Sequence, residues 1–183
     1  MILNVHPYSP QPRLIDSLIE IIKADGVIIY RTDTTYSFGC SIHSKKAMKR
    51  IYQIKQIDKK RPLTFICNDT KQFQEYTKGI STPVFRKIRS IVPGPYTFIF
   101  EGTKLVPKIM LTKRKTAGIR VPDHNVCLEL VEELGNPIIS TTATMPDRSI
   151  IYDPSLIHDE FQHDIDIVID SGQVAGKPSS VIS

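Results

Sequence analysis

The stretch Gly26–Tyr30 (GVIIY) runs directly into Arg31–Tyr36 (RTDTTY), and this junction decides the fold class. Its first half is apolar and rich in β-branched residues with no alternating polar face, which is typical of a strand buried on both faces of a sheet. Its second half crowds hydroxyls and one carboxylate at the strand end, where open α/β sheets bind ligands. An ordinary polar turn or helix cap uses the same residue types, so the segment alone leaves both interpretations open.

Helical and strand periods alternate on both sides of this junction. Apolar residues at helical spacing predict helices at 14–22, 44–52, 84–91 and 126–134, the second capped by Ser44 and the last stopped at Gly135. Apolar and β-branched runs predict further strands at 63–67, 96–100, 118–121, 137–141 and 165–170. Because isoleucines alternate with acids in 165–170, we expect this strand at a half-exposed edge. The pattern predicts a single α/β domain over residues 1–183, with helices flanking a twisted sheet of mixed parallel and antiparallel strands.

The composition is that of an ordinary globular domain, with 40% hydrophobic and 23% charged residues. No apolar stretch approaches the roughly 18 residues of a membrane-spanning helix, and the first residues lack the layout of a signal peptide. The three cysteines (Cys40, Cys67 and Cys127) lie far apart, which fits neither a disulfide framework nor a zinc clip. Together these features predict a cytoplasmic protein.

Charge is distributed unevenly around a formal net charge of +5. One basic window covers residues 45–61 with a single acid and a second covers 104–120 with none, whereas residues 151–170 hold six acids and no lysine or arginine. Taken singly, a basic run is more typical of a solvated surface. Two such windows beside an acidic segment favour an anion-binding face.

Three further segments concentrate polar or charged side chains: one just ahead of a predicted strand, one at a strand end and one near residue 180. In residues 113–122, Arg120 alternates with apolar neighbours, so its guanidinium points away from the apolar side and suits either a phosphate or a surface salt bridge. Residues 140–144 carry four hydroxyls in five positions, and residues 177–181 carry one cation and two hydroxyls. The chain has no known phosphate-loop motif and no metal-ligand spacing, and Cys127 fits a helix core better than a nucleophile.

Taken in order, these segments resemble the YrdC/YciO family of threonylcarbamoyl-AMP synthase-like proteins, and the YciO branch in particular. The match covers about residues 14 to 183 and consists of 32–36 (TDTTY), Arg50-Ile51 with Lys55, 61–63 (RPL), 93–97 (PGPYT), 118–122 (GIRVP), 140–144 (STTAT) and 178–181 (PSSV). Each motif is weak alone, but the ordered set is specific. The resemblance implies a YrdC-like sheet with a basic concave face that binds nucleotide and double-stranded RNA or tRNA.

The resemblance also implies a chemistry. Enzymatic members join L-threonine, bicarbonate and ATP into threonylcarbamoyl-AMP during N6-threonylcarbamoyladenosine formation in tRNA, and releasing pyrophosphate requires positive charge, usually with Mg²⁺. Lys55 and Thr142 are then the candidate catalytic residues. The candidate residues for binding substrate and ATP or AMP are Thr32, Thr34, Tyr36, Thr116, Arg120, Ser140, Thr144 and Ser180. The candidate RNA-binding residues are Lys59, Lys60, Arg61, Lys113, Arg114 and Lys115, and no protein metal ligand is expected.

Three positions depart from the enzymatic members of the family, and one of them, Thr142 in place of a serine, keeps the hydroxyl. Those members carry Lys-x-Arg after the second helix and Ser-x-Asn at the strand end, whereas this chain has Ile57 in place of the arginine and Thr144 in place of the asparagine. Losing a guanidinium or an amide aimed at the reacting groups costs about 2–4 kcal/mol of transition-state stabilisation. Lys59, Lys60 or Arg61 would partly replace the charge of the missing arginine. A lysine ammonium does not reproduce the paired hydrogen bonds of a planar guanidinium, however. The sequence leaves two hypotheses open, a nucleotide- or RNA-binding protein with a degenerate site and an active synthase, and favours the first.

Overall fold

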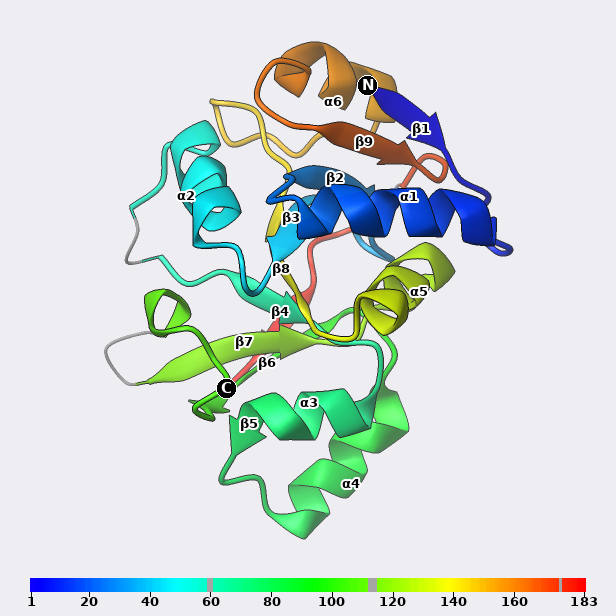
Figure 1. The fold of residues 1–183 in the computed structure, drawn as a ribbon. Helices are drawn as coiled ribbons and strands as arrows, with labels where there is room; N and C mark the ends of the chain where they lie inside the picture. Colours follow the sequence, from blue (N-terminus) through cyan, green and yellow to red (C-terminus); the bar gives the residue numbers. More distant parts are fainter. Residues whose placement is uncertain (59–60, 112–114, 175) are drawn as a thin grey trace.

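The computed structural model describes residues 1–58, 61–111, 115–174 and 176–183. Helices and strands alternate along most of the chain (Figure 1). The elements are β1 (Ile2–Asn4), α1 (Pro12–Lys23), β2 (Ile28–Arg31), β3 (Tyr36–Ser41), α2 (Lys45–Ile54), β4 (Thr64–Ile66), α3 (Thr70–Tyr76), β5 (Thr77–Lys78), α4 (Thr82–Ile91), β6 (Tyr96–Gly102), the 3₁₀ turn η1 (Lys108–Met110), β7 (Thr116–Arg120), α5 (Asn125–Leu134), β8 (Ile138–Thr142), α6 (Pro154–Phe161), β9 (Ile167–Asp170) and β10 (Ser180–Ile182).

The strands form one sheet in the order β1-β9-β2-β3-β8-β4-β7-β6-β10, and β5 pairs with β6 outside this path. The sheet contains both parallel pairs, such as β4 with β7, and antiparallel pairs, such as β3 with β8. This confirms the α/β class and the mixed sheet. Consecutive strands are often not neighbours, so residues far apart in the sequence meet on the central strands.

Helices bury both faces of the sheet because alternate strand residues point to opposite sides. Helices α1 and α5 pack on one face, where the buried side chains of Leu18 and Leu130 meet strand residues such as Ile28 and Ile138. The other face is covered by α2, α3 and α6, with Phe38 in edge contact with Phe161 of α6. Among the described residues, no helix is long and apolar enough to cross a membrane.

The expectation of an edge position for strand 165–170 is wrong. β9 lies between β1 and β2 and pairs in parallel with both, and Ile167, Val168 and Ile169 are buried. The acids that suggested exposure flank the strand rather than alternate through it, and Asp166 accepts hydrogen bonds from Arg50 (2.9 Å) and from the Val27 amide (2.8 Å). The strand that covers this edge, β1, has three residues and is too short to show a periodic pattern.

The predicted helix ends are confirmed where a specific side chain or glycine marks them. Ser44 accepts a hydrogen bond of 3.0 Å from the amide of Ala47 at the start of α2. Gly135 ends α5 in the left-handed conformation, with φ of +75°. These two caps fix where α2 and α5 meet the sheet, and α2 carries the first residue of the candidate site at its carboxyl end.

Candidate functional site

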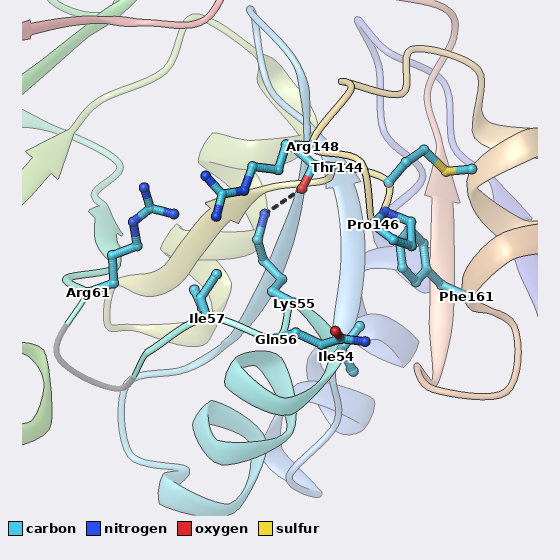
Figure 2. A pocket seen from close by; sticks show the side chains of 10 residues that line it. Ile54, Lys55, Gln56, Ile57, Arg61, Thr144, Pro146, Arg148 and Phe161 are labelled. Carbon is cyan, nitrogen blue, oxygen red and sulfur yellow. Dashed lines mark hydrogen bonds between the residues drawn. The ribbon is translucent and has the colours of Figure 1, made fainter.

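Lys55 follows the last turn of α2 and reaches the carboxyl end of β8 (Figure 2). Its ammonium donates to the carbonyl oxygen of Thr142 and, over 3.0 Å, to the Oγ1 atom of Thr144. The ammonium also lies 5.8 Å from the centre of the Phe38 ring. The structure therefore brings together Lys55, Thr142 and Thr144, although it is the carbonyl of Thr142 that meets the lysine.

The environment of Lys55 makes its ammonium unusually acidic. Burial disfavours the charged form and the nearby charge of Arg61 adds to the effect, so the pKa of Lys55 falls to about 8. At neutral pH the side chain is still charged. A ligand that interacts favourably with the ammonium would raise the pKa of Lys55 towards its ordinary value. An anion bound beside this ammonium would have that effect.

A hollow of about 330 Å³ beside Lys55 offers space for an anion. The described residues that line it are Ile54, Lys55, Gln56, Ile57, Arg61, Thr144, Met145, Pro146, Arg148 and Phe161. Three of these side chains are cationic and none is a carboxylate. Arg61 and Arg148 enter from opposite segments, and the apolar side chain of Ile57 lies between Arg61 and Lys55 in the view of Figure 2. We call this space the Lys55 hollow.

The turn after β2 forms a second group of predicted site residues. The Oγ1 atom of Thr32 accepts from the amides of Thr34 (3.2 Å) and Thr35 (3.1 Å) and donates to the Thr35 carbonyl (2.8 Å), so the turn is closed by its own hydrogen bonds. The turn presents Asp33 to Arg120 on β7, and the two side chains form an ion pair that is largely buried. Arg120 is thus held by a carboxylate inside the protein rather than at the surface.

One face of the central strands is lined with hydroxyls and glycine. We call it the hydroxyl face; its members alternate along four neighbouring strands and are Ser140, Thr142, Thr64, Thr116, Gly118 and Thr97. In register, Thr64 pairs with both Ser140 and Gly118. A Cβ at Gly118 would lie 3.3 Å from the Thr97 methyl group and 3.5 Å from the Thr64 hydroxyl, so a side chain at this position would crowd its neighbours.

The chain after β9 borders this face. The hydroxyl of Tyr36 donates to the carbonyl of Gly172 (2.7 Å), and a hydrogen bond of 2.9 Å joins the hydroxyls of Ser179 and Thr97. Burial raises the pKa of the Tyr36 phenol well above its ordinary value, so this phenol stays a donor. The neighbouring Ser180 is exposed and pairs with Tyr96, which places it on the opposite face from Thr97.

Most of the predicted site residues fall into three groups. Lys55, Thr144 and Arg61 line the Lys55 hollow, whereas Thr32, Thr34 and Arg120 lie at the turn after β2. The hydroxyl face contains Thr116 and Ser140, and the alternation of β8 places the Thr142 side chain there while its carbonyl meets Lys55. Lys115 is exposed, and Lys59, Lys60, Lys113 and Arg114 lie outside the described residues.

Sequence reasoning missed Arg148, Asp33 and Ser179 as site residues. Arg148 follows the predicted motif 140–144 by only four positions, and the basic side chain next to an Asp-Pro-rich turn was the available signal. Asp33 stands inside the TDTTY motif, where a carboxylate opposite a strand arginine is a natural ion pair. Ser179 differs from the predicted Ser180 by one position, and this difference changes the face of the sheet.

Comparisons with known proteins agree with this fold. The model of the Sua5/YciO/YrdC family, described as "Telomere recombination", matches residues 20–183. YciO of Escherichia coli K12 is 39% identical over 180 residues, which cover 97% of this chain and 87% of that protein. The crystal structure of E. coli YciO is similar with a TM-score of 0.93 at 38% identity, covering 100% of this chain and 89% of that one.

Two further relatives are more distant. The threonylcarbamoyl-AMP synthase of Vibrio vulnificus YJ016 is 24% identical over 157 residues, covering 85% of this chain and 84% of that protein. P. abyssi Sua5 complexed with L-threonine is similar in fold, with a TM-score of 0.92 at 24% identity, over 100% of this chain and 54% of that one. The family model and the identity to E. coli YciO both extend over most of the sequence. The chain therefore belongs to the Sua5/YciO/YrdC family.

Proposed function

We propose that this protein binds a nucleotide with its phosphates in the Lys55 hollow, and that its threonylcarbamoyl-AMP synthase site is degenerate. The observation that supports nucleotide binding is the Lys55 ammonium, held by the Thr142 carbonyl and the Thr144 hydroxyl beside a hollow that contains three cations and no carboxylate among its described residues. The Lys55 ammonium is partly buried, so water screens its attraction to phosphate oxygens less than it would at the surface.

Two side chains of the hollow, Ile57 and Thr144, are the reason to expect slow synthesis of threonylcarbamoyl-AMP. In the synthase reaction a carbamate oxygen attacks the α-phosphorus of ATP and pyrophosphate leaves, so guanidinium and amide donors stabilise the departing charge. Ile57 offers no donor there. The Thr144 hydroxyl already accepts from Lys55, and it cannot supply the two amide protons that an asparagine would.

The hydroxyl face is the proposed position of the rest of the substrate. Ser140 and Thr142 lie on the strand whose end meets Lys55, and Thr64 and Gly118 continue this face across the sheet. Hydroxyls donate and accept, and a glycine beside them lets a ligand approach the backbone closely. The Vibrio vulnificus relative is named as a threonylcarbamoyl-AMP synthase and Sua5 is complexed with L-threonine; by analogy, L-threonine and bicarbonate are the co-substrates of any residual synthesis.

The residues around Lys55 do not fit a protein-bound Mg²⁺. Mg²⁺ binds proteins through one or two carboxylates together with substrate phosphates. The described lining of the hollow has no carboxylate, and the described ranges hold no group of three or more His, Cys, Asp or Glu that could bind a metal ion. In this proposal the neutralising charge comes from Lys55 and the arginines.

RNA binding is a second candidate function, and the exposed side of α2 favours it. Ala47, Met48 and Ile51 are buried, while Lys45, Lys46 and Lys49 of the same helix are exposed. Three cations on one helix face suit the phosphates of double-stranded RNA or tRNA. A cytoplasmic location is consistent with this partner and with the free, buried state of Cys40, Cys67 and Cys127.

The test of the nucleotide proposal combines binding and turnover. Calorimetry should show that ATP binds, and release of pyrophosphate from ATP, L-threonine and bicarbonate should be at least about 100-fold slower than with the Vibrio vulnificus synthase. Absence of ATP binding would refute the proposal. Pyrophosphate release at the rate of that synthase would establish the active enzyme instead.

The cause of the slow synthesis can be tested by restoring the two missing groups. The double variant Ile57→Arg with Thr144→Asn should raise the rate of threonine-dependent pyrophosphate release by at least tenfold. Gln53→Arg, which adds the same charge on an exposed part of α2, should leave the rate unchanged. Equal rates for all three proteins would show that these positions do not account for the weak activity.

A further inference from the structure

In the part of the chain that the structure describes, the cations of the Lys55 hollow form no ion pair with a carboxylate. These cations are Lys55, Arg61 and Arg148. Ion pairs form elsewhere, such as Arg50 with Asp166. Like charges in one space repel each other, and the effect of Arg61 on the pKa of Lys55 reflects this repulsion. An arrangement of this kind is favourable when an anion occupies the space between the charges.

Arg148 is directed to the hollow by a strained hairpin. The chain doubles back between Thr144 and Ile150, with a hydrogen bond of 2.9 Å from the Met145 amide to the Ser149 carbonyl. Arg148 has a φ of +71°, a left-handed conformation that residues other than glycine adopt rarely and that is often retained at functional sites. The carboxylate of the adjacent Asp147 is directed to Ser149, whose amide (2.8 Å) and hydroxyl (2.6 Å) both donate to it, and among the described residues it forms no ion pair with Arg148.

Arg61 enters the hollow from the opposite side on a backbone that α2 holds in place. The Arg61 carbonyl accepts a hydrogen bond of 2.9 Å from the Tyr52 hydroxyl, and the Arg61 amide donates to the Asp58 carbonyl over 2.8 Å. Both arginines are exposed, so their guanidinium groups are accessible to a ligand. Figure 2 shows both groups directed into the space above Ile57.

Resting on the proposed nucleotide-binding function, we propose that Arg148 and Arg61 form a clamp for the terminal phosphates of a nucleoside triphosphate, in place of the guanidinium absent at Ile57. A guanidinium binds a phosphate through two parallel hydrogen bonds, and two of them from opposite segments fix a chain of phosphates in position and direction. The ligand class is therefore an oligophosphate, free or as part of a nucleotide, and a nucleoside monophosphate lacks the terminal phosphates that the clamp would hold.

The test is calorimetric binding of ATP, tripolyphosphate and AMP to the wild type and to Arg148→Gly. Glycine adopts the left-handed conformation freely, so this variant removes the guanidinium and keeps the hairpin folded. The affinities for ATP and tripolyphosphate should fall at least tenfold, while the affinity for AMP stays within twofold. Arg148→Lys should recover part of the loss, and Arg86→Ala on exposed α4 should bind all three ligands as the wild type does.

The outcomes separate this inference from the nucleotide proposal. If the wild type binds ATP and Arg148→Gly binds it equally well, the clamp is refuted and nucleotide binding stands. If tripolyphosphate binding depends on Arg148 while neither ATP nor AMP binds, nucleotide binding is refuted and the arginines are a clamp for free oligophosphates only. An equal loss for AMP and ATP would also refute the clamp, since Arg148 would then not distinguish the terminal phosphates.

Discussion

Lys55 is an ammonium whose charge depends on pH near neutrality. Its pKa of about 8 lies below the ordinary lysine value because the side chain is partly buried and Arg61 is close. Below pH 8 the amine is protonated and attracts phosphate; above pH 8 it is neutral and acts only as a weak donor. A phosphate ligand favours the protonated form, so its binding should raise this pKa.

The first prediction follows from this change of the Lys55 charge with pH. ATP affinity should fall by about tenfold per pH unit as the pH rises above 8, and binding at pH 8 should take up a fraction of a proton. Calorimetry in buffers of different ionisation enthalpy measures both effects. In Lys55→Arg, whose charge persists throughout, the affinity should be nearly independent of pH between 7 and 9. A wild-type affinity that does not change over this range would exclude Lys55 from the binding site.

The buried ion pair of Asp33 and Arg120 leads to the second prediction. Asp33→Asn leaves the Arg120 charge without its counter-ion in a largely buried place, so the free energy of unfolding should fall by about 3 kcal/mol. The matched control is the exposed pair of Lys78 and Glu101, where Glu101→Gln should cost less than 1 kcal/mol. Urea denaturation measures both values, and similar losses would mean that Arg120 is solvated despite its position.

At the scale of elements, α2 provides a third prediction because Ser44, the residue before it, caps its amino terminus and α4 lacks such a cap. Ser44 accepts from the Ala47 amide, whereas the Ser81 side chain at the start of α4 makes no capping hydrogen bond. Ser44→Ala should therefore lower the free energy of unfolding by about 1 kcal/mol. Ser81→Ala should change it by only a few tenths of this amount in the same denaturation experiment. Equal losses would show that the cap does not stabilise α2.

The elements that could be predicted are those whose pattern is long or sharply ended. Apolar spacing and Gly135 located α5, and Ser44 located α2. Three-residue strands such as β1 and β10 have no period to detect, and without β1 the strand β9 looked like an edge. Pairing between distant segments decides which strand is central, and local sequence does not contain this information.

The sequence identified side chains that meet in the structure where a motif and its neighbour lie on fixed elements. Lys55 at the end of α2 and Thr144 after β8 were assigned from short motifs, and their side chains meet. Arg148 was not assigned because its direction depends on a left-handed backbone angle inside a hairpin. The resemblance to the family showed that Ile57 replaces an arginine, but it did not indicate that Arg61 and Arg148 lie around Ile57.

At the scale of the whole molecule, charge separates into a basic and an acidic region, and the fourth prediction concerns RNA. The affinity for a duplex RNA should decrease with salt, and replacing Lys45, Lys46 and Lys49 by alanine should reduce the slope of log affinity against log salt by up to about 3. Replacing Lys71, Lys87 and Arg89 on α3 and α4 removes the same charge from another part of the molecule and should reduce it less (Figure 1). Equal reductions would indicate attraction by net charge alone.

The position of β9 between β1 and β2 has a consequence for synthesis on the ribosome. Strand β1 pairs with β9, so Ile2 has no strand partner until Val168 has been synthesised. Translation releases the amino-terminal segments first, and their apolar side chains then remain exposed until the last strands emerge. The sheet is therefore completed only after translation of nearly the whole chain, and a stalled nascent chain ending before residue 167 should be a ready substrate for chaperones and proteases.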